Sequence, residues 1–244
     1  MKAMILCAGL GTRLKPITDK IPKALVEIEG VPVLERLILN LKSQGFDEII
    51  INVHHFAEMV KNFIVSKDFG VNIEISDESD ELLDTGGGII KAYPLLFKNN
   101  DHPVLIHNVD ILSNADLRSF YKKGTDTKLL VSDRESSRKL IFDDNMVLKG
   151  WHNLQTDSYR PEGINISPMG DFREFAFSGI YVMSKASIDE MKELLGKGKY
   201  SVMDYFLHER RRKEIKGEVD KDLQLLDIGK PATLLQASKF VLKN

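Results

Sequence analysis

Short runs of apolar, often β-branched residues alternate in the first half of the chain with stretches of helical periodicity. Residues 3–8, 49–53, 71–75 and 104–106 predict buried strands. Between them, apolar residues recur at helical spacing over 33–41 and 56–65, and a third helix is predicted to open at Gly86. The stretch from Ser113 to Asp116 is typical of a capped helix start. Strands and helices that alternate in this way predict a mostly parallel sheet covered on both faces.

The pattern changes after about residue 128. Residues 139–143 and 147–151 flank an Asp-Asn pair and predict a hairpin, and residues 175–183 and 223–228 predict further strands. A helix is expected over 201–212, where Ser201 and Asp204 are suited to cap it, and another from about Ala232. Residues 159–170 are rich in turn-forming residues and predict a loop. The whole pattern predicts a three-layer αβα, doubly wound, Rossmann-like fold with a mostly parallel mixed sheet and a small β-hairpin lobe.

The charge of the chain is nearly balanced. Its 244 residues include 34 basic and 36 acidic ones, whereas a nucleic-acid binder usually carries a strong basic excess. The one basic run, residues 210–213, is expected to be a solvated helix face. A single cysteine, Cys7, excludes an internal disulfide and a cysteine-based zinc cluster. No signal pattern and no apolar stretch near the ~20 residues of a membrane helix are present, so we expect a cytoplasmic protein without nucleic-acid or membrane partners.

A glycine-rich loop follows the first predicted strand, with the sequence GLGTR at residues 9–13. Its glycines allow backbone N–H groups to approach an anion, and Arg13 adds a forked cation suited to phosphate oxygens. A dinucleotide fingerprint needs a third glycine at position 14, which is Leu14, and a Walker A loop needs a Gly-Lys-Ser/Thr element that the chain lacks. Lys23, next to the rigid Pro22, is placed to aim an ammonium group back toward this loop.

Three further motifs carry candidate chemistry. The glycines at 86–88 open a predicted helix, where free N–H groups meet an anion or a flat ligand lies on the backbone. Asp110 follows the strand at 104–106, at the edge where open α/β sheets bind ligands. Asp227 ends a late strand, and with Asp110 it would complete a two-carboxylate Mg²⁺ site. His107 is expected to pack beneath the site.

Together these motifs resemble those of the sugar-1-phosphate nucleotidyltransferases. The resemblance rests on the loop at 9–13 with Pro16, on the Pro-Lys-Ala-Leu element at 22–25, and on later motifs at 84–88, 108–110, 177–180 and 227–229. Within that family the chain is most similar to N-acetylmuramate-1-phosphate uridylyltransferases and mannose-1-phosphate guanylyltransferase-like proteins. The resemblance implies Mg²⁺, an NTP with UTP or GTP favoured, a sugar 1-phosphate and a monomer or dimer.

The resemblance also implies a role for individual residues. One catalytic domain, residues 1–244, would consist of a nucleotide-binding half, 1–127, and an acceptor-binding half, 128–244. Arg13 and Lys23 would be the catalytic cations, and Asp110 and Asp227 the metal ligands. Asp110, Gly179 and Trp151 would contact the substrate. The nucleotide would be bound by Ala8, Gly9, Gly11, Thr12, Arg13, Lys23, Thr85, Gly86, Gly87, Gly88 and Asn108.

Two departures leave alternatives open. Cys7 replaces the alanine usual in the family's loop, and the family's Glu-Lys-Pro or Glu-Asn-Pro element is absent from the corresponding residues 149–154. Trp151 either stacks on an acceptor or packs in the hairpin. One alternative function is a cytidylyltransferase acting on phosphocholine or another non-sugar phosphate. The other is a non-catalytic nucleotide-sensing module.

Overall fold

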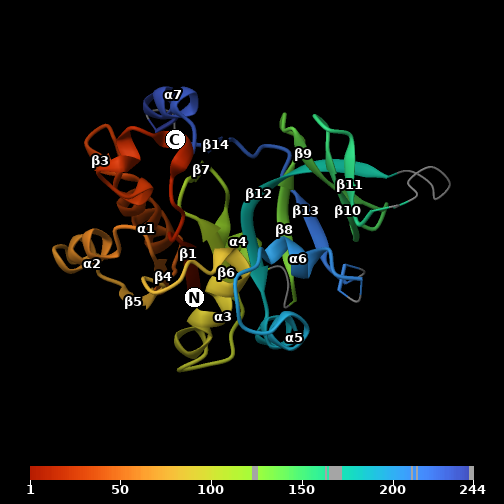
Figure 1. Cartoon of the computed structure of the whole chain (residues 1–244), viewed down its shortest axis with the longest axis horizontal. Helices are drawn as coiled ribbons and strands as arrows, with labels where there is room; N and C mark the ends of the chain where they lie inside the picture. Colours follow the sequence, from red (N-terminus) through yellow and green to blue (C-terminus); the bar gives the residue numbers. More distant parts are fainter. Residues whose placement is uncertain (123–125, 163, 165–171, 210, 213, 242–244) are drawn as a thin grey trace.

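The chain is built around one mixed sheet whose first-half strands are parallel (Figure 1). The computed structural model describes residues 1–122, 126–162, 164, 172–209, 211–212 and 214–241. The parallel strands are β1 (Lys2–Leu6), β4 (Glu48–Val53), β5 (Asn72–Asp77) and β6 (Val104–Asn108). β1 lies between β4 and β6, and β5 forms the edge beyond β4.

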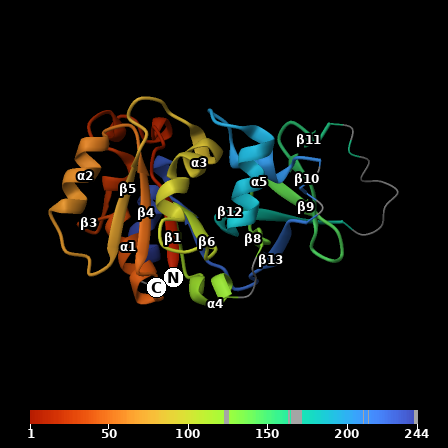
Figure 2. The ribbon, with the colours of Figure 1, turned by 90° about the horizontal axis from the view of Figure 1, so that it is seen from below.

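The second half of the chain extends the sheet on the other side of β6. The long strand β12 (Arg173–Met183) runs antiparallel to β6 and also pairs with β8 (Lys128–Ser132) and β9 (Arg138–Phe142). β13 (Lys216–Val219) joins β8, and β10 (Leu148–Asn153) and β11 (Ser158–Arg160) continue beyond β9. Figures 1 and 2 show this β9–β11 lobe at the opposite end of the molecule from α2 (Ala57–Val65). The predicted α/β fold with a mixed sheet is confirmed.

Helices cover both faces of the sheet, because its inner strands are apolar on both sides. In β1, Ala3 and Ile5 pack into one core, while Met4 and Leu6 pack into the other. Such two-sided burial explains why the strand is a continuous apolar run. The first core is covered by α1 (Val33–Ser43), α2, α4 (Leu117–Lys122) and α7 (Pro231–Val241). The second is covered by α3 (Asp84–Leu96), α5 (Lys185–Leu195) and α6 (Val202–Phe206).

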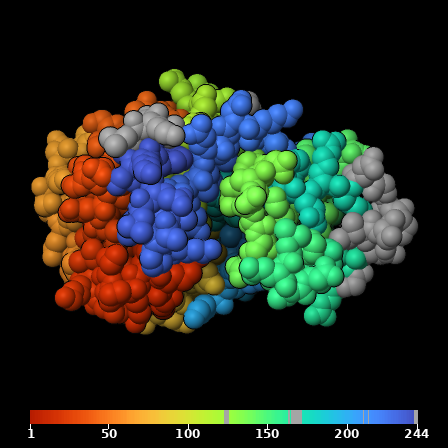
Figure 3. Space-filling model, turned by 90° about the horizontal axis from the view of Figure 1, so that it is seen from above, coloured from red at the N-terminus to blue at the C-terminus, as the bar shows by residue number. Residues whose placement is uncertain are grey.

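Two short ribbons and three short turns of helix complete the part of the fold that the structure describes. One ribbon pairs β2 (Glu27–Ile28) with β3 (Val31–Pro32), and the other pairs β7 (Ile111–Ser113) with β14 (Leu225–Asp227). The helical turns are η1 (Thr12–Leu14), η2 (Ile17–Asp19) and η3 (Lys23–Leu25). In Figure 3 the blue residues of the C-terminal part lie against red residues of the N-terminal part.

The helix α6 and the residues after it test two predictions, the helix over 201–212 and the solvated basic face. Ser201 caps α6 in a capping box with Asp204, as expected, but α6 ends at Phe206 rather than near 212. The prediction of a solvated helix face is wrong for Arg211, which is only 5% exposed. Its guanidinium lies 2.6 Å from the carboxylate of Asp126 and 3.4 Å from that of Glu190. Positions 210 and 213 lie outside the described residues.

Other boundaries differ because tertiary pairing overrides local pattern. α3 begins at Asp84, ahead of the glycines, and Ser113 lies in β7 while Asp116 accepts a 2.8 Å hydrogen bond from the N–H of Ser119 at the start of α4. The elements β8, β13 and α5 have no counterpart in the predicted pattern. Residues 158–160 form β11 instead of a loop, and 165–170 lie outside the described residues. None of the helices in the described residues is long and apolar enough to cross a membrane.

Candidate active site

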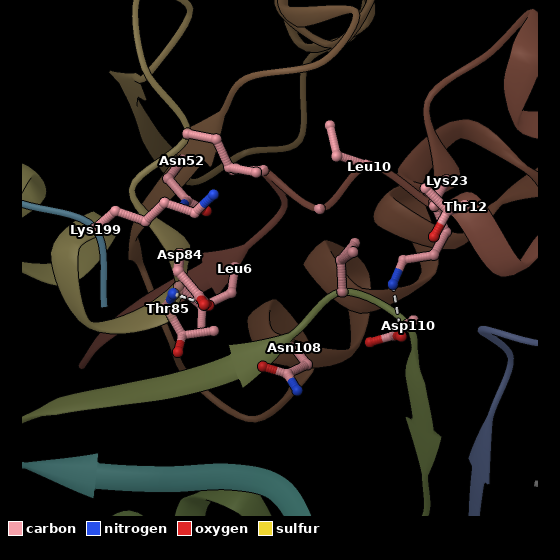
Figure 4. A pocket seen from close by; sticks show the side chains of 15 residues that line it. Leu6, Leu10, Thr12, Lys23, Asn52, Asp84, Thr85, Asn108, Asp110 and Lys199 are labelled. Atoms are coloured by element: carbon pink, nitrogen blue, oxygen red, sulfur yellow. Dashed lines mark hydrogen bonds and ion pairs between the residues drawn. The ribbon is translucent and has the colours of Figure 1, made fainter. Parts of the chain in front are cut away.

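A cleft of about 450 Å³ lies at the carboxyl ends of the parallel strands (Figure 4). Leu6 and Asn108 are direct partners in the β1–β6 ladder, so the loop after β1 and the residues after β6 meet at this edge. The chain leaves β1 toward β4 and returns to its other side at β6, which is the switch point where such sheets bind ligands. The cleft is lined by Leu6, Ala8, Gly9, Leu10, Gly11, Thr12, Lys23, Asn52, Leu82, Asp84, Thr85, Asn108, Val109, Asp110 and Lys199.

The glycine-rich loop forms one wall of the cleft and is fixed by its own contacts. Gly11 has a φ of 65°, and its carbonyl accepts a 2.8 Å hydrogen bond from the hydroxyl of Thr18. A Cβ at Gly11 would lie 2.9 Å from the Thr18 methyl, so both conformation and space require glycine there. A Cβ at Gly9 would have no neighbour within 4 Å. The loop is therefore anchored at Gly11 and open toward a ligand at Gly9.

A lysine–carboxylate pair lies at one end of the cleft. Lys23 begins η3 directly after Pro22, and its Nζ lies 2.6 Å from Oδ2 of Asp110, the second residue after β6. The two side chains are only 14% and 11% exposed. Low exposure strengthens this attraction, and the ion pair holds the ammonium group beside the loop.

The late Asp227 reaches the same point through the short β7–β14 ribbon. Asp227 pairs with Ile111, and the N–H of Ile228 donates a 3.0 Å hydrogen bond to the carbonyl of Asp110. The N–H of Gly229 donates to Oδ1 of Asp227 at 2.8 Å. The ribbon thus brings the two predicted carboxylates together although they are far apart in sequence.

Arg13 completes this cluster above Gly229. A Cβ at Gly229 would lie 2.7 Å from Nη2 of Arg13, 2.8 Å from Oδ1 of Asp227 and 3.0 Å from Oδ2 of Asp110. Three charged groups therefore surround a space that only glycine leaves free. Among the described residues there is no group of three or more His, Cys, Asp and Glu able to hold a metal. An ion at this point would be held by two carboxylates and by oxygens of the substrate, as Mg²⁺ commonly is.

The three glycines of α3 serve close packing of the backbone, which differs from the predicted role. The N–H groups of Gly86 and Gly87 donate to the carbonyl of Tyr200, at 2.9 and 3.3 Å, so the expectation of free N–H groups there is wrong. A Cβ at Gly87 would lie 2.0 Å from the carbonyl oxygen of Gly198. The glycines at 86–88 are buried and do not line the cleft. Gly86 and Gly87 allow the segment before α6 to pack against α3. Their contact with a nucleotide stays a prediction, whereas Thr85 does line the cleft.

The predicted substrate residues of the second half lie behind or beyond the cleft. Gly179 has a φ of 77°, and a Cβ there would lie 2.7 Å from Nδ2 of Asn108, so Gly179 makes room for a cleft residue. Trp151 is half-buried in β10, packs against the second core and does not line the cleft. The roles of Gly179 and Trp151 in substrate binding stay predictions.

The end of the cleft far from Lys23 contains two residues, Asn52 and Lys199, that the sequence pattern did not single out. Figure 4 shows Asn52, Asp84, Thr85 and Lys199 at this end, and Thr12, Lys23 and Asp110 at the other. The one available indication was Asn52, an amide inside the apolar run of β4. Lys199 has no motif around it, and Leu6, Leu10, Leu82 and Val109 enter only through the packing of their elements.

Two titratable groups beneath the site are neutral. Burial lowers the pKa of His107 to about 4, and its Nδ1 lies 2.8 Å from the carbonyl of Asn108, which confirms that this residue packs below the cleft. Burial also raises the pKa of the Cys7 thiol to about 12. At neutral pH neither group carries a charge that would compete with those of Arg13, Lys23 and the two carboxylates.

Comparison with known proteins decides the family. Residues 2–133 match the family model described as nucleotidyl transferase, which covers more than half of the chain. The chain belongs to the nucleotidyl transferase family. The matched segment includes β1, the glycine-rich loop, Lys23 and Asp110, which are the parts that build one side of the cleft.

Relatives of this nucleotidyl transferase cover most of its length. The N-acetylmuramate alpha-1-phosphate uridylyltransferase of Neisseria meningitidis serogroup B is 33% identical over 195 residues, which are 77% of this chain and 82% of that protein. The D-glycero-alpha-D-manno-heptose 1-phosphate guanylyltransferase of Aneurinibacillus thermoaerophilus is 30% identical over 246 residues, covering 98% and 97% of the two chains. The crystal structure of HddC from Yersinia pseudotuberculosis shares the fold, with a TM-score of 0.75, 23% identity and coverage of 98% and 99%.

The buried thiol gives a first prediction. Because the thiolate is the reactive form and the pKa of Cys7 is about 12, iodoacetamide should leave the folded protein unmodified at pH 8 over an hour. After unfolding in guanidinium, intact-mass measurement should show one adduct, since the chain has one cysteine. Rapid single labelling of the native protein would contradict the burial of Cys7.

The packing of α3 gives a second prediction. Gly87→Ala should destabilise the protein by about 1–3 kcal/mol, because the new methyl overlaps the Gly198 carbonyl and the segment before α6 must shift. Denaturant unfolding measures this. The matched control is Gly9→Ala, which should change the free energy of unfolding by less than about 0.5 kcal/mol. Equal values for the two variants would show that the close approach at Gly87 does not exist.

Proposed function

We propose that this nucleotidyl transferase moves a nucleoside monophosphate from an NTP to a sugar 1-phosphate, forming an NDP-sugar and pyrophosphate. The observation that carries the proposal is the convergence of Arg13, Lys23, Asp110 and Asp227 beside the glycine-rich loop. A site with two cations and two carboxylates suits a triphosphate and a divalent ion. The relatives in Neisseria and Aneurinibacillus are named as 1-phosphate uridylyl- and guanylyltransferases, which favours UTP or GTP and a sugar 1-phosphate here.

We place the NTP in the cleft with its triphosphate toward Lys23 and its base at the opposite end. The triphosphate would lie along Ala8, Gly9, Gly11 and Thr12 toward Lys23, where the cations are. The base would lie at the other end, beside the polar groups of Thr85 and Lys199 and near the α3 glycines at 86–88. Lys199 supplies a cation from the 128–244 half. This half would bind the acceptor, with Asn108 and Gly179 at its border and Trp151 in its lobe, and we propose that both halves form one catalytic domain.

The reaction needs positioning and charge neutralisation more than acid–base chemistry. An oxygen of the acceptor phosphate attacks the α-phosphorus of the NTP in line, forming a new P–O bond. The bond from the α-phosphorus to the bridging oxygen breaks, and pyrophosphate leaves with its electron pair. Lys23 and Arg13 would stabilise the negative charge that builds up on the α-phosphoryl and leaving oxygens. No side-chain base is required, because a phosphate monoester with a second pKa near about 6 is already ionised at neutral pH.

The residues around Gly229 fit a Mg²⁺ ion. Oδ2 of Asp110 and Oδ1 of Asp227 border the space that a Cβ at Gly229 would fill, and hard carboxylate oxygens are the ligands that Mg²⁺ prefers. Bound there, the ion would neutralise substrate phosphate charge. In the free enzyme Lys23 balances Asp110, so its ammonium group would be released toward the phosphates when an ion takes its place. We also propose a cytoplasmic setting, where NTPs are supplied, and a monomer or dimer.

The carboxylates give a third prediction. Asp110→Asn and Asp227→Asn should each lower kcat by about 10²–10³, because each removes an anionic ligand without changing side-chain size. Pyrophosphate release measures this, and the stabilisation of the wild type by NTP with Mg²⁺ in thermal unfolding should be lost in both. The control is Asp144→Asn, an exposed carboxylate in the hairpin turn, which should leave both readouts unchanged. Near-normal turnover of the Asp110 variant would remove the proposed metal site.

The substrates give a fourth prediction. A panel of UTP, GTP, CTP, ATP and dTTP with several sugar 1-phosphates and phosphocholine should release pyrophosphate with UTP or GTP and a sugar 1-phosphate. Turnover confined to CTP with phosphocholine would favour the cytidylyltransferase alternative instead. NTP binding without turnover in any combination would favour a nucleotide-sensing module.

A further inference from the structure

A fully buried carboxylate, Glu78, lies directly behind the nucleotide cleft. It follows β5, its side chain is 0% exposed, and it belongs to none of the motifs of the sequence. Burial raises the pKa of this carboxyl group. A buried carboxylate is costly unless hydrogen bonds satisfy its oxygens, so the contacts of Glu78 indicate its purpose.

The contacts of Glu78 form a chain of hydrogen bonds across the site. Its Oε1 accepts from Nδ2 of Asn52 at 2.7 Å, and its Oε2 accepts from the N–H of Leu83 at 3.4 Å. Oδ1 of Asn52 in turn accepts from the N–H of Cys7 at 2.7 Å. Cys7 is the first residue after β1, and Leu83 directly precedes α3. These hydrogen bonds therefore join the start of the glycine-rich loop to the start of α3.

Helix α3 closes over this chain of contacts. A Cβ at Gly88 would lie 2.7 Å from Oε1 of Glu78 and 2.8 Å from Nδ2 of Asn52. Gly88 thus lets the helix backbone seal the pair from one side, while Asn52 borders the cleft on the other. This close approach gives the last of the three glycines a role that is separate from the contacts of Gly86 and Gly87.

The direction of the hydrogen bonds requires these two residue types. Both oxygens of Glu78 face donors, so an ionised carboxylate satisfies both, whereas an amide would place an NH₂ against one of them. The amide of Asn52 must present its oxygen to Cys7 and its nitrogen to Glu78. Only one arrangement of donors and acceptors therefore satisfies the pair. In that arrangement the pair fixes the positions of both backbone segments that it joins.

We propose that Glu78 and Asn52 are a positioning pair that sets the separation between the glycine-rich loop and the start of α3, and so shapes the base end of the cleft. Both segments line the cleft, one through Ala8 to Thr12 and the other through Leu82, Asp84 and Thr85. The inference rests on the proposed function, because it assigns the cleft to an NTP. Neither residue contacts the reacting phosphates in this assignment.

Glu78→Gln tests the proposal. It should raise the KM for the NTP and the Kd of the NTP measured by calorimetry without acceptor by about tenfold, as expected for one lost buried hydrogen bond. The kcat and the KM for the acceptor should change less than about twofold, because nucleotide binding alone is affected. The control Glu81→Gln makes the same change on an exposed side chain of the same loop and should bind NTP as the wild type does.

A transposed double variant separates positioning from general stability. Asn52→Asp alone places a second carboxylate against Glu78 and should weaken NTP binding as well. In Asn52→Asp/Glu78→Gln, the carboxylate introduced at position 52 accepts from the N–H of Cys7 and from the amide introduced at position 78. The oxygen of that amide still accepts from the N–H of Leu83, so every hydrogen bond returns. NTP affinity should recover to within about threefold of the wild type. If Glu78→Gln does not fold, this double variant still decides the matter.

Two results would overturn the proposal. The first is unchanged NTP affinity in folded Glu78→Gln. The second is a double variant whose melting temperature returns to that of the wild type while its NTP affinity does not, since the pair would then serve stability alone. A wild-type protein that binds NTP but releases no pyrophosphate with any acceptor would end the proposed transfer reaction only, because the calorimetric comparison would still test the pair.

Discussion

The parallel pairing of β1 with β4 and β6 is the constraint on which the rest of the structure depends. It places the carboxyl ends of three strands at one edge, and every group of the cleft leaves the sheet there or is brought to it. The loop after β1 supplies open backbone, β4 supplies Asn52, and the turn after β6 supplies Asp110. Because the three strands are hydrogen-bonded in fixed register, these groups keep their separations without a ligand.

The polar groups at this edge are arranged in complementary pairs. Lys23 neutralises Asp110, and Arg13 lies at the point that Asp110 and Asp227 share. Behind them, both carboxylate oxygens of Glu78 meet only donors. Pairing reduces the cost of removing these charges from water. It also holds the cations at positions where they could form ion pairs with a triphosphate. The free enzyme is in this sense already organised for an anionic ligand and a divalent ion.

The two halves of the chain differ in how closely they follow their relatives. The family model ends at residue 133, close to the end of the parallel half, whereas the relative in Aneurinibacillus can be aligned over nearly the whole chain at 30% identity. All of the cleft residues except Lys199 lie in the matched half. The other half contributes Lys199, from the segment before α6, and we propose that this half binds the acceptor.

The sequence by itself determined the α/β class, the glycine-rich loop and the identity of the charged residues, because strand and helix periodicity and the glycine and proline positions are local properties. It also predicted the capping box of α6, which depends on residues three apart. It did not predict the burial of Arg211, the loss of free N–H groups at Gly86 and Gly87, or the entry of Asn52 and Lys199 into the cleft. Only the tertiary structure decided these, since each depends on a segment distant in sequence. The same reason explains why Glu78 carried no indication in the sequence: its partners at Asn52 and Leu83 define it, and they meet only when β4, β5 and α3 pack together.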